Sequence, residues 1–275
     1  MPELPEVETE RGRLASRLRG RQLLRVRIDD PRLTRPDDPA VVAGTLAGDR
    51  VAEVERRGKY LLVRLESGRV LLVHLRMTGG FRYKPASHER AVLELEDGTR
   101  IAYRDLRRFG TWQLFEAEDM EEHLGIRLGP EPLERGFTKA FLAGRLADRA
   151  APVKAAILDQ RTVAGLGNIY SDEALWHAQI HPQRPAGTLS TEEIAALREG
   201  IRKALRIGIR HQGADLGDGT YAGGRMQERF NVYGRGGEPC NRCGTPIEKI
   251  RVAGRGTWYC PSCQVSPRSG NRRPV

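Results

Sequence analysis

The sequence contains only four cysteines among its 275 residues, and all four lie between residues 240 and 263. This clustering argues against the distributed disulfides of a small secreted protein and favours a metal site. No apolar run approaches the ~18 residues of a membrane-spanning helix, and the acidic N-terminus lacks the basic and apolar regions of a signal peptide. We therefore expect a soluble, cytoplasmic protein.

Lysine is also scarce, since only six of the 46 basic residues are lysines and the other 40 are arginines. A lone surface arginine is therefore a weak signal of function, whereas each lysine merits individual attention. The formal charge of +10 points to a polyanionic partner, most simply nucleic acid. The chain is long enough for one large domain or two ordinary ones.

An amphipathic helix is expected directly after the first few residues. Pro5 suits an early helical position, and Gly20 can end the helix. Val7, Leu14 and Leu18 fall on one face at helical spacing. A packed helix is thus predicted to anchor the N-terminal tip.

Between about residues 21 and 116 the apolar period changes to two, which is typical of strands. Two predicted hairpins turn at Ser67-Gly68 and at Asp97-Gly98, each flanked by apolar segments. Several strands with short turns and few helices favour an antiparallel sandwich.

The second half of the chain is expected to be helical. Residues 131–150 read as a linker, and helical periodicity follows near residues 152–162, 168–178 and 190–212. The sequence therefore predicts an α+β multidomain protein, in which an N-terminal helix plus antiparallel β-sandwich precedes a helical domain with a cysteine finger.

Two CxxC pairs form that finger, which contains, in order, Cys240, Cys243, Cys260 and Cys263. Four thiolates at this spacing can hold one Zn²⁺ tetrahedrally, in a closed structural site with no open position for catalysis. A disulfide pair and a redox CxxC are the alternatives, and neither suits the context. The segment 235–275 has eight basic and two acidic side chains, so it remains basic enough to sit on phosphates after zinc binding.

The first residues carry a candidate nucleophile. Removal of Met1 would leave the secondary amine of Pro2 at the tip, and an α-amino group titrates at roughly 7.7–8.0, so part of it is free base at neutral pH. Attack of this amine on a carbonyl-like carbon gives a charged iminium, and Glu3 is close enough to move a proton there. The alternative is a frayed terminus without chemistry.

Other candidate residues each have a plainer alternative. Lys59 opens an apolar strand, where it would transfer a proton or bind phosphate, or else extend to solvent. Met77 and the loop Arg107-Arg108-Phe109-Gly110 could form an apolar wedge that enters a duplex. The alternatives are that Met77 fills the core and that the loop is an ordinary basic turn. Asn168 is expected at a helix N-cap, a position that also binds phosphate. Arg255 lies where the finger hairpin should turn.

Together the motifs closely resemble bacterial formamidopyrimidine-DNA glycosylase from residue 1 to about residue 264. They are Pro2-Glu3-Leu4-Pro5-Glu6, Lys59, Arg107-Arg108-Phe109-Gly110, the Gly165–Tyr170 turn and the four-cysteine finger. The resemblance implies a bifunctional DNA glycosylase and abasic-site lyase of base-excision repair. Its substrate would be duplex DNA with oxidised purines, namely 8-oxoguanine and formamidopyrimidines, and its second half a helix–two-turns–helix domain. A two-domain clamp around one lesion needs no partner subunit, so we expect a monomer.

The resemblance also implies catalytic roles. Pro2 would attack C1′ of the damaged nucleotide and hold the sugar as an iminium. Glu3 would donate or accept protons at the sugar, and Lys59 would donate a proton during β-elimination. Arg255 would take part in δ-elimination and grip the flanking phosphates.

The remaining implied positions form the DNA site. Met77, Arg107 and Phe109 would form the wedge, with Arg107 facing the orphaned cytosine. The other positions implied by the resemblance are His88, Arg149, Lys154 and Asn168 as DNA contacts, and Glu173 as a support of the active site.

Two departures from the family pattern are visible. Leu106 stands where proline is usual, and the lesion-capping loop from Gly213 to Arg229 is short and glycine-rich, so its base-reading contacts near Gly217 to Tyr221 stay open. Leu4 argues against the endonuclease VIII-like branch, which prefers oxidised pyrimidines. A zinc-ribbon protein that only binds damaged DNA is the alternative from a different class.

The expected domain boundaries follow from these motifs. They are 1–130 for the catalytic N-terminal domain, 131–150 for the linker, 151–230 for the helix–two-turns–helix domain, 231–264 for the zinc finger and 265–275 for a disordered basic tail.

Overall fold

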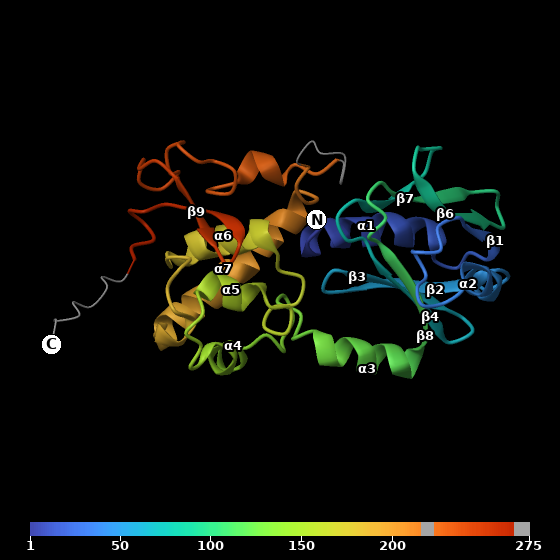
Figure 1. Cartoon of the computed structure of the whole chain (residues 1–275), viewed down its shortest axis with the longest axis horizontal. Coiled ribbons are helices and arrows are strands. Elements are labelled where there is room, and N and C mark those ends of the chain that lie inside the picture. Colours follow the sequence, from blue (N-terminus) through green and yellow to red (C-terminus); the bar gives the residue numbers. More distant parts are fainter. Residues whose placement is uncertain (216–222, 267–275) are drawn as a thin grey trace. The chain divides into compact units, whose positions relative to one another are not determined.

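The computed structural model describes residues 1–215 and 223–266 of the chain (Figure 1). By their internal contacts the residues form two compact units. The first comprises Met1–Gly129 and Gly208–Gln227, and the second comprises Pro130–Ile207 and Glu228–Val275. The second unit therefore interrupts the first in the sequence. The expected contacts near Gly217 to Tyr221 and most of the basic tail lie outside the described residues.

The first unit begins with helix α1 (Leu4–Leu18). Val7, Leu14 and Leu18 are all 0% exposed, which confirms the apolar face predicted from the sequence. After the helix, Gly20 turns the chain with a φ of 72°, a backbone conformation that favours glycine.

Two four-stranded antiparallel sheets follow, with the strand orders β1-β6-β7-β5 and β2-β3-β4-β8. The strands are β1 (Leu23–Ile28), β2 (Val51–Arg57), β3 (Tyr60–Leu65), β4 (Arg69–His74), β5 (Gly79–Arg82), β6 (Glu89–Leu95), β7 (Arg100–Asp105) and β8 (Thr111–Glu116). Helices α2 (Pro39–Leu46) and α3 (Ala117–Arg127) accompany them. The predicted helix plus antiparallel sandwich is confirmed.

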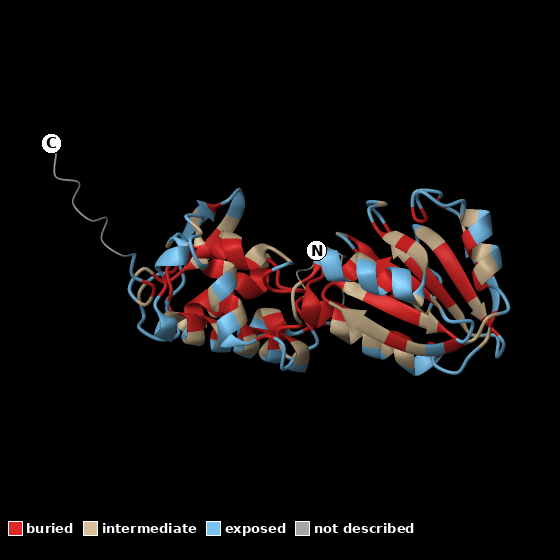
Figure 2. Cartoon of the chain, turned by 90° about the horizontal axis from the view of Figure 1, so that it is seen from below, coloured by how far each residue is buried: buried red, intermediate tan, exposed pale blue. Residues whose placement is uncertain are grey.

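The core of the sandwich combines apolar side chains from both sheets and from α1. Three aromatic rings lie within it, and Tyr103 contacts Phe81 and Trp112 edge to face, with 5.4 Å between ring centroids in each pair. Figure 2 shows the buried residues, in red, along the strands of this unit. Removal of this apolar surface from water is the main force that holds the sheets together.

Both predicted hairpins are present. Strand β3 pairs with β4 and strand β6 pairs with β7, each antiparallel to its neighbour. Gly68 and Gly98, at the respective turns, have φ values of 91° and 80°. Glycine adopts this left-handed conformation without steric strain, which is why these two dipeptides turn the chain.

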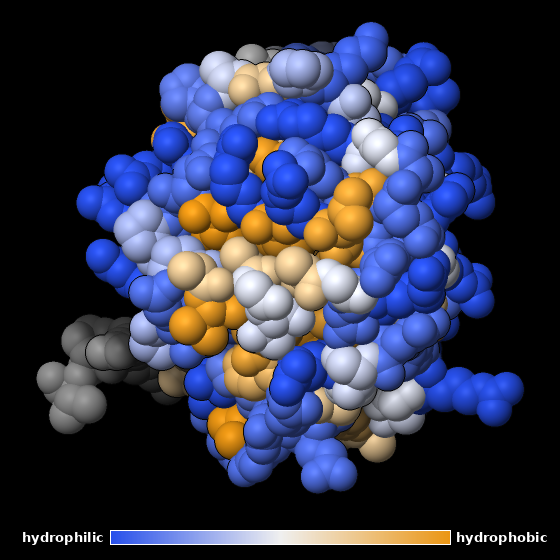
Figure 3. Space-filling view, turned by 90° about the vertical axis from the view of Figure 1, so that its right-hand side faces the viewer, coloured by the Kyte–Doolittle hydropathy of each residue, from blue (hydrophilic) through white to orange (hydrophobic). Residues whose placement is uncertain are grey.

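Part of the surface of the first unit is apolar. Figure 3 shows apolar side chains gathered on one face, at the end where α2 and β1 lie in Figure 1. Leu24 of β1 and Val41 of α2 are 63% and 66% exposed. Exposed apolar side chains are ordinary on folded proteins, and neither element carries a predicted site residue.

The second unit is mainly helical and contains a two-stranded hairpin. Its elements are α4 (Lys139–Leu146), α5 (Val153–Leu158), α6 (Asn168–Ala178), η1 (Ala186–Thr188), most of α7 (Thr191–Arg210), β9 (Glu248–Val252) and β10 (Arg255–Tyr259). The short helix η2 (Met226–Arg229) spans the point where the chain passes back into this unit. The predicted helices at 168–178 and 190–212 are confirmed. No helix in the described part of the chain is long and apolar enough to cross a membrane.

Two local expectations differ from the structure. Residues 131–150, expected as a linker, contain α4, whose first turn is capped by the Thr138 hydroxyl and whose Leu142 and Leu146 are buried. Helix α5 ends earlier than predicted, because the Asp159 side chain accepts a hydrogen bond from the Arg161 N–H at 3.0 Å and turns the chain.

Candidate active site and nucleic-acid interface

The N-terminal tip is held in place and does not fray. Pro2 is buried and Glu3 is 3% exposed, directly before α1. The Glu3 N–H donates a hydrogen bond of 2.8 Å to Oε2 of Glu6, and the other oxygen of Glu6 accepts a bond of 2.7 Å from the Ala214 N–H. One carboxylate thus ties the tip to the start of the 213–229 segment.

Gly213 makes this arrangement possible. Its φ is 78°, and a Cβ atom at this position would lie 2.7 Å from both Cγ and Oε1 of Glu6. The glycine is therefore required for two independent reasons, the left-handed backbone and the close approach of the Glu6 side chain.

Lys59 lies in the turn between β2 and β3 and is 6% exposed. Its side chain therefore does not extend to solvent, which was the plainer alternative. Nearby, His74 packs edge to face on Tyr60, with 4.6 Å between the ring centroids. Burial, assisted by the charges of Arg76 and Lys59, lowers the pKa of His74 to about 3. The imidazole is therefore neutral, and its Nδ1 accepts a hydrogen bond of 2.9 Å from the Arg76 N–H.

The proposed wedge residues lie at the ends of strands in the first unit. Met77, in the turn between β4 and β5, is half-buried, whereas Phe109, between β7 and β8, is 52% exposed. The Arg107 guanidinium lies over the Phe109 ring, 4.9 Å from its centroid. Leu106 is 48% exposed in the same loop. This loop therefore presents two apolar side chains and a cation to solvent.

Arg108 has a different role from Arg107. Its φ is 58°, and its guanidinium makes two hydrogen bonds to Asp30, at 2.6 and 2.8 Å. These bonds lower the pKa of Asp30. Arg108 therefore fixes the loop to the body of the unit, and it leaves Arg107 as the exposed arginine of the pair.

The other predicted surface contacts lie in different units. His88, in the first unit, is exposed with a φ of 61°, and its carbonyl oxygen accepts a hydrogen bond from the Asp105 N–H. Arg149, in the second unit, is partly exposed, and its Nη1 lies 3.8 Å from Oδ2 of Asp159. Both side chains are accessible.

Lys154 is not on the surface, contrary to expectation. It is 0% exposed and lies 2.7 Å from the carboxylate of Asp172. Its Nζ also donates to Oγ1 of Thr257 at 2.7 Å and to the Gly256 carbonyl at 3.1 Å. Burial raises the pKa of Asp172 to about 7, although Lys154 acts in the opposite direction. The lysine thus holds the finger hairpin to α5 and α6.

Asn168 contacts the same hairpin. It is the first residue of α6, and Gly167 occupies the N-cap position, so the predicted capping role is wrong. The Asn168 side-chain amide instead donates a bond of 3.0 Å to the Gly256 carbonyl, because the hairpin packs against this end of the helix. Its Oδ1 is buried without a hydrogen-bond partner among the described residues.

Glu173 is also fully buried, with 0% exposure. Its carboxylate accepts backbone hydrogen bonds from Asn231, Val232 and Tyr233 at 2.9–3.0 Å. This carboxylate therefore organises the segment that leads to the finger.

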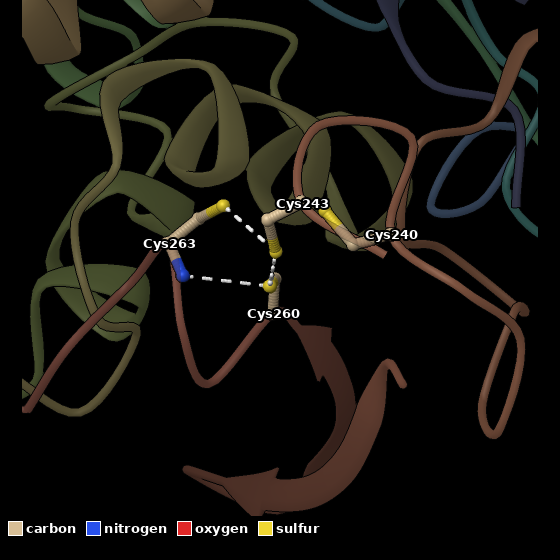
Figure 4. A group of neighbouring side chains, drawn as sticks. All are labelled: Cys240, Cys243, Cys260 and Cys263. Carbon is tan, nitrogen blue, oxygen red and sulfur yellow. Dashed lines mark hydrogen bonds between the residues drawn. The ribbon is translucent and has the colours of Figure 1, made fainter. Parts of the chain in front are cut away.

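The four cysteines converge on one point, as Figure 4 shows. Their sulfur atoms all lie within 4.8 Å of one another, and none is in a disulfide. The Cys243 sulfur lies 3.4 Å from that of Cys260 and 3.5 Å from that of Cys263. A Zn–S distance of about 2.3 Å requires sulfur atoms roughly 3.8 Å apart in a tetrahedron, so the set fits zinc. Four thiolates leave no open position on the metal.

Arg255 begins β10, directly after the turn at Ala253 and Gly254, which have positive φ values of 47° and 78°. Its side chain is exposed, and the residue pairs with Val252 across the hairpin. The predicted hairpin between the cysteine pairs is thus confirmed, with the arginine at its tip.

Sequence reasoning missed the acidic residues that hold these groups. Glu6, Asp30, Asp105 and Asp172 are at most 3% exposed, and each accepts hydrogen bonds from another part of its own unit. Only Glu6 had a usable signal, because an acidic residue three positions after Glu3 is typical of a helix start.

These features define a two-unit zinc-ribbon protein. One unit is a sandwich with an anchored N-terminal tip, and the other is helical and carries a basic ribbon with four thiolates. Family models match three consecutive regions. They are the formamidopyrimidine-DNA glycosylase N-terminal domain over residues 1–112, the formamidopyrimidine-DNA glycosylase H2TH domain over residues 128–218, and the zinc finger found in FPG and IleRS over residues 237–265. The chain belongs to the formamidopyrimidine-DNA glycosylase family.

Known members of this family are similar to the chain over nearly their whole length. The formamidopyrimidine-DNA glycosylase of Chloroflexus aggregans is 47% identical, with 96% of this chain and 99% of the relative covered. The crystal structure of the MutM (Fpg) protein of Thermus thermophilus is 45% identical, with a TM-score of 0.87 and coverage of 96% and 98%. A Lactococcus lactis FPG mutant in complex with Fapy-dG-containing DNA is 35% identical, with a TM-score of 0.90 and coverage of 96% and 100%.

Proposed function

We propose that this protein is a DNA glycosylase of base-excision repair, which removes oxidised purines from duplex DNA and then cleaves the abasic strand. The observation that carries the proposal is the family match along the whole chain, since related structures contain DNA with Fapy-dG and with carbocyclic 8-oxo-G. The anchored N-terminal tip adds a chemical reason. It places Pro2, whose nitrogen becomes the terminal amine once Met1 is removed, next to the buried Glu3 at the start of α1.

In the proposed reaction, the Pro2 amine attacks C1′ of the damaged nucleotide after removal of Met1. The bond from C1′ to the base breaks, and the base leaves with a proton. The C1′–O4′ bond then opens, O4′ takes up a proton, and the opened sugar is held as an iminium on Pro2. Glu3 donates and accepts protons at the sugar, and its burial favours proton transfer over exchange with solvent. Attack by an amine in equilibrium with its free base needs no metal at this position.

The charged iminium then withdraws electrons and makes successive eliminations possible. Lys59, buried in the β2–β3 turn, donates a proton during β-elimination. Arg255, exposed at the tip of the finger hairpin, assists δ-elimination and grips the flanking phosphates. The finger zinc, bound by the four cysteines, fixes the hairpin and takes no part in the chemistry.

The DNA contacts divide into two groups. Met77, Arg107 and Phe109 enter the duplex and replace the extruded base, a step that costs a few kcal/mol. His88 and Arg149 supply phosphate contacts, which give affinity without sequence information.

Lys154, Asn168 and Glu173 act indirectly. Their hydrogen bonds hold the finger hairpin and the segment before it, so we assign them positioning rather than direct contact. Because one chain carries every group in the scheme, we propose that it acts as a monomer, on the nucleoid DNA of the cytoplasm.

The first experiment is borohydride trapping on a duplex with one 8-oxoguanine opposite cytosine, followed by mass mapping of the cross-linked peptide. An adduct on Pro2 is expected. Trapping only with an oxidised pyrimidine or a bare abasic site would keep the lyase and overturn the purine assignment. The pyrimidine belongs in this panel because a related structure contains such DNA.

Two variants separate the enzyme from a protein that only binds damaged DNA. Glu3→Gln should slow base excision by roughly 10²–10⁴-fold, the range for loss of a general acid–base group, with binding kept. Pro2→Gly should likewise lose excision. Glu118→Gln, at an exposed position in α3, is the control. Unchanged excision in both N-terminal variants would overturn the roles of Pro2 and Glu3, whereas a wild-type protein that binds the lesion duplex without excising the base would establish the binding-only alternative.

A further inference from the structure

The two loops that carry the proposed wedge are distant in sequence and adjacent in the fold. Met77 precedes β5, and Arg107 and Phe109 follow β7. Strands β5 and β7 pair antiparallel, and Gly79 lies opposite Asp105. The start of one strand and the end of the other therefore bring the two loops side by side.

A buried carboxylate joins the loops. Asp105 is 1% exposed, and its Oδ1 accepts a hydrogen bond from the hydroxyl of Thr78, the residue after Met77. Its Oδ2 accepts a bond of 2.7 Å from the Gly110 N–H, at the far end of the second loop. The Thr78 hydroxyl in turn accepts a bond of 2.9 Å from the Arg107 N–H. Two side chains thus link both ends of one loop to the other.

The Tyr103 side chain packs against the backbone of both loops. A Cβ atom on Gly79 would lie 2.1 Å from the Tyr103 hydroxyl oxygen, and one on Gly110 would lie 1.9 Å from it. Both glycines therefore let the backbone touch this fully buried ring. With the loop bases fixed in this way, the freedom that remains belongs to the side chains at the tip.

We propose that Thr78 and Asp105 are positioning residues, which couple the Met77 turn and the Leu106–Phe109 loop so that the wedge enters the duplex as one body. This inference rests on the proposed function. The coupling matters because loops that moved independently would have to be ordered at the moment of insertion, whereas a preorganised tip avoids that cost. Loss of this hydrogen-bond network should therefore slow base extrusion from a duplex. It should not affect the chemical steps at a sugar that is already exposed.

The test compares two substrates under single-turnover conditions. One is a duplex with 8-oxoguanine opposite cytosine, which the wedge must enter, and the other is a single-stranded oligonucleotide with an abasic site. Thr78→Val keeps the shape of the side chain and removes the hydroxyl. We expect it to slow excision from the duplex about tenfold or more, with cleavage of the single strand changed less than about twofold.

Three further variants make the result specific. Thr78→Ser restores the hydroxyl and should restore the duplex rate. Thr34→Val removes another buried hydroxyl of the first unit, one that donates to the Asp37 carbonyl at 2.9 Å, and should leave both rates unchanged. Asp105→Leu removes both acceptor oxygens of the network and should reproduce the Thr78→Val pattern. Thermal unfolding of each variant checks that it is folded at the assay temperature.

A double variant tests whether Thr78 acts through the wedge. Phe109→Ala with Thr78→Val should be no slower on the duplex than the slower single variant, because both changes impair the same step. Equal slowing on both substrates, or multiplied effects in the double variant, would overturn the coupling. A wild-type protein inactive on both substrates would instead overturn the proposed function, and the coupling with it.

Discussion

The ammonium group of Lys154 and the carboxylate of Asp172 lie 2.7 Å apart, and both side chains are 0% exposed. A buried pair of this kind is sensitive to removal of one partner, because the other is left as an uncompensated charge. The pair also supports the hairpin that presents Arg255, through the bonds from Lys154 to Gly256 and Thr257.

Lys154→Met should therefore lower the free energy of unfolding of the second unit by ~3–5 kcal/mol at pH 8, measured by denaturant unfolding. The loss should be smaller near pH 5, where Asp172 is protonated, since burial already raises its pKa to about 7. The double variant with Asp172→Leu should recover most of the stability, because no unpaired charge then remains buried.

Lys139→Met, at an exposed position in α4, is the control and should change stability by less than about 0.5 kcal/mol. If Lys154→Met kept full stability and instead weakened DNA binding with a reduced salt dependence, Lys154 would be a phosphate contact after all.

Removal of zinc should unfold the finger and leave the first unit intact. Cys240, Cys260 and Cys263 pack with Trp176, Val232 and Ile247 in a small core, which has too little apolar surface to persist without its metal. A colorimetric indicator should detect one zinc per chain, and a strong chelator should abolish DNA binding before the sandwich unfolds. Cys260→Ser should reproduce this loss. DNA binding that survives complete removal of the metal would contradict a structural finger.

The stability of the first unit should fall at mildly acidic pH because of His74. In the folded protein its pKa is about 3, against 6.5 for an ordinary histidine, so the unfolded chain takes up the proton first as the pH falls. The contribution of the neutral His74 to the free energy of unfolding is fully present above pH 6.5. It is lost as the pH falls toward 3, by about 1.4 kcal/mol per pH unit.

His74→Asn supplies the comparison, because its Oδ1 can accept the Arg76 N–H bond without titrating. Between pH 7 and pH 5 the variant should lose less stability than the wild type in parallel denaturant titrations. Identical slopes in the two proteins would mean that His74 is not held neutral.

Gly213→Ala should damage both stability and activity. Gly98 supplies a matched control, since its φ of 80° is close to the 78° of Gly213 and nothing lies within 4 Å of an added Cβ. Each alanine should cost roughly 1–2 kcal/mol for the left-handed backbone. Gly213→Ala should cost more, because it displaces Glu6 from the Glu3 and Ala214 N–H groups, and borohydride trapping should fall in this variant alone. Equal effects of the two substitutions would argue against the Glu6 bridge.

Much of the fold could be predicted from local sequence patterns. Helix α1, the two glycine turns and the paired CxxC knuckles follow from spacing and from the conformational freedom of glycine, both of which are visible in the sequence. Helix α4 was missed because the prolines and glycine before it suggested a linker, whereas burial of Leu142 and Leu146 stabilises the helix. Local sequence contains no record of such tertiary packing.

The site was less predictable for the same reason. Lys154 is a basic residue in a basic protein, and nothing in its neighbourhood in the sequence indicates that Asp172 and the hairpin enclose it. The hydrogen bonds to the carboxylates of Glu6 and Asp105 come from residues far apart in the chain, so the sequence alone could not indicate these partners. A motif can indicate which groups react, whereas the residues that hold them become visible only in the fold.

The division of the first unit between Met1–Gly129 and Gly208–Gln227 has a consequence for biosynthesis. The ribosome releases the sandwich sequence first, yet the Ala214 N–H that binds Glu6 emerges only after most of the second unit has been translated. A nascent chain can thus form its sheets early but completes the anchor of its N-terminal tip late. Prematurely terminated chains would carry the proposed nucleophile without its final support, so we expect the proposed reactivity toward DNA to arise only close to the end of translation.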